Sequence, residues 1–237
     1  MSEPFCVSIK DLEFAWRPGP AVLSVASFNV RRGERVFLYG ASGSGKSTLL
    51  GLIAGVFSVG RGDLQVLDHS LQTMSGAARD ALRADAMGVI FQQFNLVPFL
   101  SLVDNVLLPC RFSPARAART GATPAQRTQA AFALLERLGL AREAAEGRAA
   151  SALSVGQQQR VAAARALIGA PSLIIADEPT SALDAAARDT FLTTLLEEAR
   201  QAAVLFVSHD VALAARFDRS ASMETLNAAA PGGADDG

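Results

Sequence analysis

The 237-residue chain has only two cysteines and two histidines, and it has no long uninterrupted apolar run although half of its residues are hydrophobic. Its two cysteines, Cys6 and Cys110, lie far apart without metal-ligand spacing, which predicts reduced thiols in a cytosolic protein. A formal net charge of −1 gives no general attraction to nucleic acid or to an anionic membrane, so no nucleic-acid partner is expected. Residues 1–10 contain no signal-peptide core, and the longest apolar run, 49–59, is too short to span a bilayer. Any role at a membrane would therefore need a partner.

Lysine is scarce too. Of the 22 lysines and arginines, only Lys10 and Lys46 are lysines. Lys46 belongs to the segment Gly40–Thr48, GASGSGKST, which fits G-x-x-x-x-G-K-[ST] between a short apolar run and a helical stretch. Such a loop turns backbone N–H groups toward phosphate oxygens, and the helix start adds partial positive charge. The alternative, a Gly/Ser-rich surface turn, leaves this context unexplained, so the segment predicts a nucleoside triphosphate site.

Within this phosphate loop, Lys46 supplies a compact cation for the β- and γ-phosphates, and the Ser47 hydroxyl is placed to ligate Mg²⁺. The residues predicted to bind the phosphates are Gly40, Ser42, Gly43, Gly45, Lys46, Ser47 and Thr48.

The pattern of apolar residues predicts one α/β domain. Alternation over 7–16 and 22–30 indicates a small antiparallel β layer. Continuous apolar runs indicate buried strands, two of which, 173–176 and 204–207, are expected to be parallel. Strand signals fade over 94–158, where helical patterns interrupted by proline predict an inserted helical subdomain.

The sequence also predicts the bounds or buried faces of three helices and the state of the C-terminal tail. In the helix over 127–138, Phe132, Leu135 and Leu138 are expected to share one buried face, and Gly139 to end the helix. A second helix begins at Ser154 and ends by Gly169. A third carries an apolar stripe formed by Phe191, Leu192, Leu195, Leu196 and Ala199. Residues 228–237 have no pattern and are expected to be disordered.

Two carboxylates follow the apolar run 173–176. Asp177 stands at the strand end, from which it can reach Mg²⁺ or its waters, and Glu178 can polarise an attacking water as a general base. An apolar strand ending in Asp-Glu is common by itself. The phosphate loop earlier in the chain is what favours the functional interpretation.

The segment Leu153–Arg160, LSVGQQQR, resembles the LSGGQ signature of ATP-binding cassette (ABC) ATPases. In that family the signature closes over the nucleotide of a second subunit, which here assigns Ser154, Gly156 and Gln157 to ATP in the partner's loop. The alternative is a helix start capped by a serine. Further family motifs then match in order along residues 5–219.

The resemblance implies a role for each matching residue. DEPTSALD at 177–184 resembles the Walker B motif running into the D-loop, which places Asp184 at the nucleotide. His209 corresponds to the switch histidine that contacts the γ-phosphate and orients Glu178. Gln92 corresponds to the glutamine that touches Mg²⁺ or water, with Gln93 as a rival.

The two remaining assignments concern an aromatic residue and the other histidine. Trp16 corresponds to the aromatic that stacks on adenine, although it could instead be a core residue. His69, the second of two histidines, is expected to be structural.

The family resemblance also implies an architecture and an assembly. The expected fold is a P-loop NTPase (RecA-like) core with an N-terminal antiparallel β layer, built from about 5–93 and 159–225, and a helical subdomain at about 94–158. Two such ATPase subunits, in a homodimer or in a pair with a paralogue, would bind ATP and Mg²⁺ between them and drive a separate integral membrane permease from the cytoplasmic face. Residues 75–109 are most similar to the lipoprotein-release and macrolide-export group.

Alternatives and departures from the family remain. The chain could be an ABC ATPase without a transport role, such as a cell-division regulator, or another P-loop class such as a small kinase. Val155 replaces the second signature glycine, and we expect it to have a negative φ and to retain activity. Residues 220–227 stand where the family has an acidic-Gly β-turn, which puts a terminal β extension in doubt.

Overall fold

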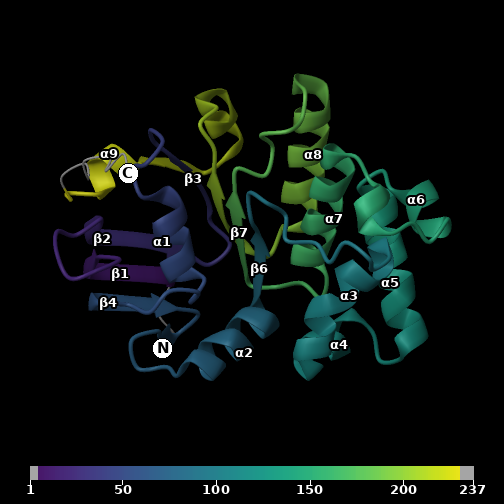
Figure 1. The fold of residues 1–237 in the computed structure, drawn as a ribbon, viewed down its shortest axis with the longest axis horizontal. Coiled ribbons are helices and arrows are strands. Elements are labelled where there is room, and N and C mark those ends of the chain that lie inside the picture. Colours follow the sequence, from purple (N-terminus) through teal and green to yellow (C-terminus); the bar gives the residue numbers. More distant parts are fainter. Residues whose placement is uncertain (1–4, 230–237) are drawn as a thin grey trace.

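The computed structural model describes residues 5–229, and most of the tail predicted to be disordered lies outside that range. Two sheets form the framework (Figure 1). A four-stranded antiparallel sheet has the order β2-β1-β4-β5, and a five-stranded parallel sheet has the order β6-β7-β8-β3-β9. The predicted fold class, an α/β P-loop architecture with an antiparallel β layer, is confirmed.

The antiparallel sheet contains β1 (Phe5–Phe14), β2 (Leu23–Arg31), β4 (Arg61–Val66) and β5 (His69–Ser70). Ile9 on β1 pairs with Phe28 on one side and with Leu64 on the other, and all three side chains are buried. The alternation predicted for the opening of the chain therefore arises because one face of this sheet packs on the core.

The parallel sheet contains β3 (Arg35–Tyr39), β6 (Met87–Ile90), β7 (Leu173–Asp177), β8 (Ala203–Val207) and β9 (Arg219–Ser222). β8 is buried at every position, which explains its continuous apolar sequence. Helix α1 (Lys46–Ile53) follows β3 after the phosphate loop, and Figure 1 places it beside the antiparallel sheet. β9 was not expected from the sequence.

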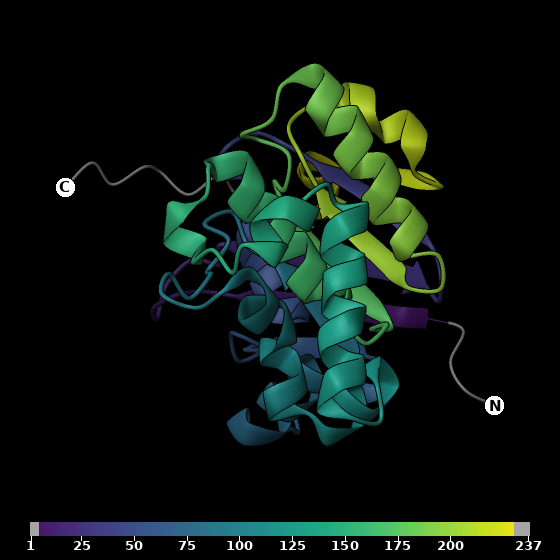
Figure 2. The same cartoon turned by 90° about the vertical axis from the view of Figure 1, so that its right-hand side faces the viewer.

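Helices cover the other side of the parallel sheet (Figure 2). The chain passes through α2 (Gly76–Ala86), α3 (Leu102–Phe112), α4 (Pro114–Thr120), α5 (Pro124–Arg137), α6 (Ala141–Ala145), a 3-10 turn (Ala150–Ala152), α7 (Val155–Leu167) and α8 (Ala185–Glu198). A 3-10 segment (Val211–Arg216) and α9 (Met223–Leu226) complete the order. Over residues 5–229, no helix is both long enough and apolar enough to cross a membrane.

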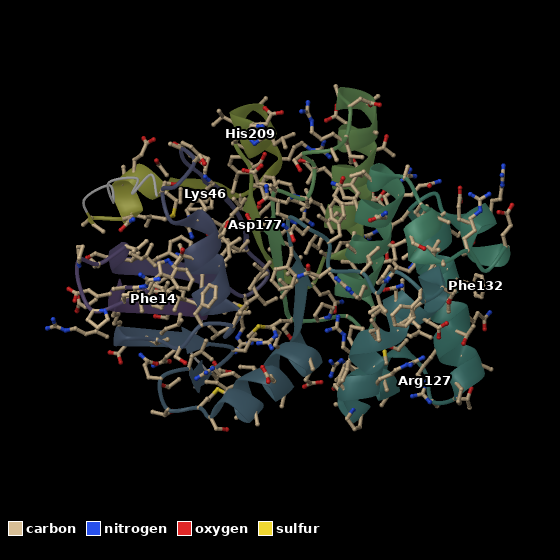
Figure 3. The ribbon with its side chains drawn as sticks, in the orientation of Figure 1. Phe14, Lys46, Arg127, Phe132, Asp177 and His209 are labelled. Carbon is tan, nitrogen blue, oxygen red and sulfur yellow. The ribbon has the colours of Figure 1, made fainter. Side chains whose placement is uncertain are left out.

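The helix predictions are confirmed except for one apolar face. The α8 stripe is buried, and Gly139 ends the α5 region with φ +73°. Phe132 was expected to be buried with Leu135 and Leu138 but is 37% exposed, and Figure 3 shows it on the outer side of α5. Ala131 and Leu134 face the core instead, because they stand one turn before Leu135 and Leu138.

Candidate active site

A cavity of about 490 Å³ lies where β3, β7 and β8 end, at the start of α1. The carboxyl ends of parallel strands meet at one edge of a sheet, which is where α/β proteins build their ligand sites. In Figure 3, Lys46, Asp177 and His209 lie in this region between the β layer and the helical side. The lining residues are Trp16, Val22, Gly40, Ser42, Gly43, Gly45, Lys46, Ser47, Thr48, Gln92, Asp177, Glu178 and His209.

Backbone geometry opens the phosphate loop toward this cavity. Gly43 and Gly45 have φ values of +76° and +95°, a region that residues with a Cβ rarely adopt. Gly45 caps α1 without any side-chain hydrogen bond to the first turn, so the N–H groups at the helix start are free for a ligand. The Nζ atom of Lys46 donates to the carbonyl oxygens of Gly40 at 2.8 Å and Ala41 at 2.7 Å. The ammonium group is thereby held over its own loop.

Asp177 and Ser47 form the second part of the site. Burial raises the pKa of the Asp177 carboxyl above its ordinary value, and the hydrogen-bonding Ser47 hydroxyl opposes that rise. A carboxylate beside a hydroxyl is a pair of hard oxygen donors, the kind that Mg²⁺ takes when phosphate and water complete its coordination. Residues 5–229 contain no group of three His, Cys, Asp or Glu side chains that could hold a metal by themselves. The donor set therefore fits Mg²⁺ bound together with a phosphate ligand.

Glu178 and His209 form the third part. Glu178 has φ +47°, an uncommon conformation for a residue with a side chain, and its N–H donates to the Val207 carbonyl at 3.0 Å. Its Oε2 atom lies 3.0 Å from Nδ1 of His209. The imidazole is 69% exposed and the carboxylate side chain 20% exposed, so the pair stands at the cavity rim with the histidine outermost.

Trp16 and Gln92 line the cavity from two further segments. Trp16 lies past the end of β1 and is 56% exposed, which excludes the alternative of a core residue. Its ring makes edge contacts with Phe14 at 4.9 Å and Phe57 at 4.8 Å between centroids, and these leave part of the indole free. Gln92 follows β6, and its neighbour Gln93 is not among the lining residues.

The remaining predicted residues lie outside this cavity. Ser154 caps α7 and forms a capping box with Gln157, and Asp184 caps α8 by accepting from the Ala187 N–H at 2.8 Å. Val155 is the first residue of α7, so its φ is helical and negative as expected, and its side chain is 55% exposed. The structure therefore does not bring Ser154, Gly156, Gln157 and Asp184 to the phosphate loop of their own chain.

Sequence reasoning missed three residues at the site. Val22 lines the cavity, and Met223 and Asn227 contact the phosphate loop from the C-terminal segment. None of them belongs to a motif, and only the tertiary fold brings them to the loop. A larger, mostly apolar cavity of about 640 Å³ lies between α2 and α3 and shares no lining residue with the first.

Comparison with known proteins gives a consistent result. The family model described as "ABC transporter" matches residues 23–181. The lipoprotein-releasing system ATP-binding protein LolD of Pseudomonas fluorescens is 38% identical over 92% of this chain and 95% of its own. The macrolide export ATP-binding/permease protein MacB of Chromobacterium violaceum is 39% identical over 88% of this chain and 32% of its own. The dimeric post-hydrolysis structure of the ATP-binding cassette MJ0796 with ADP and Pi superposes with TM-score 0.82, at 32% identity, over 93% and 94% of the two chains.

Proposed function

Because the chain belongs to the ABC transporter family and is an ATPase subunit of its lipoprotein-release and macrolide-export group, we propose that two copies close around ATP and drive a separate permease. One observation carries this proposal. The phosphate loop and the strand-end carboxylates line one cavity, whereas Ser154 and Gly156 lie outside it. A site that needs the phosphate loop together with Ser154 and Gly156 is completed only by a second subunit. The related MJ0796 cassette is dimeric.

Phosphate binding rests on the loop. The N–H groups at the start of α1 and the Lys46 ammonium stabilise the negative charge of the β- and γ-phosphates. Ser47, Asp177 and Gln92 would hold Mg²⁺, which would neutralise negative charge on the phosphates. Trp16 would stack on adenine through the exposed part of its ring.

Hydrolysis rests on the pair at the cavity rim. Glu178 accepts a proton from the attacking water as the general base, and its hydrogen bond with His209 fixes the carboxylate. The imidazole, more exposed than its partner, faces the region that the γ-phosphate and the second subunit would fill. Both residues follow paired strands, so the geometry is supported by the sheet.

Mixing two variants tests the shared site. Lys46→Ala removes the loop cation, and Val155→Glu places a negative charge at an exposed first-turn position that a helix tolerates. Each homodimer should lose hydrolysis. In an equal mixture, half of the dimers contain one subunit of each variant. Each of these heterodimers keeps one of its two sites intact, so hydrolysis should recover to about a quarter of the wild-type rate. No recovery would contradict a site shared between subunits. Val155→Gln, which matches the size without the charge, should stay active.

The permease contact is proposed at the groove between α2 and α3. Phe112 is 73% exposed on this groove, and Phe91, the neighbour of Gln92, also lines it. A partner bound there would touch both the helical side and the segment that carries Gln92. Held by a permease in this way, the subunit would lie peripherally on the inner face of the membrane. Phe112→Glu should keep basal hydrolysis and lose co-purification with the permease, whereas Phe132→Glu, on α5, should lose neither. Loss of basal hydrolysis in Phe112→Glu would contradict this assignment.

A further inference from the structure

The C-terminal segment, defined as Arg219–Ala229, returns to the phosphate loop. β9 pairs in parallel with β3, and Ser222 is in register with Tyr39, the residue immediately before Gly40. α9 follows directly, and Figure 1 shows it above β2 at the left edge of the molecule. Ala228 extends the contact by donating its N–H to the Ser24 carbonyl at 2.8 Å. The loop is therefore flanked by residues from far along the chain.

Met223 packs against both ends of the loop. Its side chain is fully buried. A Cβ built on Gly40 would lie 2.9 Å from the Met223 Cβ, and one built on Gly45 would lie 3.6 Å from its Cε. Backbone and side chain approach so closely at Gly40 that a residue larger than glycine would displace the segment or the loop.

Asn227 links the loop to the start of β2 through one amide group. Its Nδ2 donates to the carbonyl oxygens of Ser44 at 3.2 Å and Val22 at 3.1 Å. Its Oδ1 accepts from the N–H of Ser24 at 2.8 Å. Ser44 belongs to the phosphate loop and Val22 lines the cavity. Val22 in turn donates its N–H to the Phe14 carbonyl at 2.8 Å, beside the segment that carries Trp16.

We propose that Asn227 is a positioning residue for nucleotide binding. Its amide sets the phosphate loop at a fixed distance from Val22 and Trp16, so that the phosphate end and the base end of a nucleotide meet a cavity of constant shape. Asn227 is only partly buried and touches no reacting atom, so its effect is on affinity rather than on the chemical step. The inference rests on the proposed placement of the nucleotide between the loop and Trp16.

Asn227→Asp tests the link selectively in the full chain. Aspartate keeps the acceptor for Ser24 but removes both donors, and it brings a negative charge to the Ser44 carbonyl. The fluorescence of Trp16, the single tryptophan, reports ADP and ATP binding directly. We expect both Kd values to rise about three- to tenfold, the size of one or two lost hydrogen bonds. kcat at saturating ATP should stay within about twofold, because the chemical step is untouched.

A matched control and a second readout complete the test. Thr225→Ala removes a hydroxyl that donates to Ser222 within the same segment and should leave both Kd values unchanged. Hydrogen exchange should become faster over residues 40–47 in Asn227→Asp and in Asn227→Ala, with no change in β1. Unchanged Kd values or unchanged loop exchange in a folded variant would overturn the proposal, even if the melting temperature fell. Failure of the wild-type chain to bind ADP would instead contradict the proposed function.

Discussion

His209 and Glu178 form a hydrogen-bonded pair, with 3.0 Å between Nδ1 and Oε2, across the ends of two neighbouring strands. β7 and β8 are parallel, and Asp177 is in register with Val207, so the residues that follow each strand emerge side by side. The positive φ of Glu178 turns the chain immediately after Asp177. Two adjacent acidic residues thereby take different positions, one beside Ser47 and one beside the imidazole.

Glu178→Gln should separate ATP binding from hydrolysis. The amide keeps the size of the side chain but cannot accept a proton from water, and general bases contribute about 10²–10⁴-fold to rate. We expect hydrolysis to fall by about that factor and an ATP-bound dimer to persist on size exclusion. Glu197→Gln, at an exposed position on α8, should behave as wild type. A Glu178→Gln variant that stays monomeric with ATP and hydrolyses normally would refute the role of Glu178.

Asp177→Asn should stabilise the nucleotide-free protein and abolish hydrolysis. Burial raises the pKa of Asp177, so its contribution to stability is fully present below the ordinary pKa of 3.8 and is lost as pH rises through the higher folded value. Above its folded pKa, Asp177 carries a partly buried charge that asparagine lacks. The variant should have the higher melting temperature at pH 7, and the difference should shrink toward pH 4. Asp189→Asn, exposed on α8, is the control, and a difference that grows on acidification would contradict the burial argument.

Trp16→Ala should weaken nucleotide binding without changing the fold. Stacking of a base on an aromatic side chain contributes about 1–3 kcal/mol, so Kd for ATP should rise by about five- to a hundredfold. Calorimetric titration measures the change without relying on tryptophan fluorescence. Phe112→Ala removes another exposed aromatic residue, away from the cavity, and should leave the Kd unchanged. Equal Kd values for wild type and Trp16→Ala would show that adenine lies elsewhere.

Arg116→Met should destabilise the contact between the helical side and the core. The residue is 1% exposed, and its guanidinium donates to five backbone carbonyls in two stretches of the chain, namely those of Ala84, Met87, Arg165, Ala166 and Ile168. Desolvation by burial lowers its pKa to about 10. Methionine fills the volume but leaves these carbonyls without the donor, so we expect a loss of about 3–5 kcal/mol in the free energy of unfolding, measured by urea denaturation. Arg127→Met, at a half-buried position on α5 where the guanidinium donates to the Thr123 carbonyl alone, should change it by about 1 kcal/mol or less.

The sequence predicted the parts of the site that short segments encode. The phosphate loop, the carboxylates after β7 and the histidine after β8 each follow a buried strand, and apolar runs reveal such strands. Phe132 was misassigned because apolar residues in this helix fall on more than one possible face. The buried face passes through Ala131 and Leu134, which leaves Phe132 at its exposed edge. Asn227 could not be found, since nothing local marks a residue whose partners, Ser44 and Val22, lie about 180–200 positions earlier.

The order of strands in the parallel sheet constrains how this protein is made. β3 leads into the phosphate loop, yet its only sheet neighbours among residues 5–229 are β8 and β9, which span 203–222. A growing chain on the ribosome exposes the loop early, but the described partners of the strand that anchors it lie more than 160 residues further along the chain. Strands that are far apart in the sequence pair slowly during folding. The strand that leads into the phosphate loop therefore gains its sheet partners only once residues 203–222 are available to pair with it.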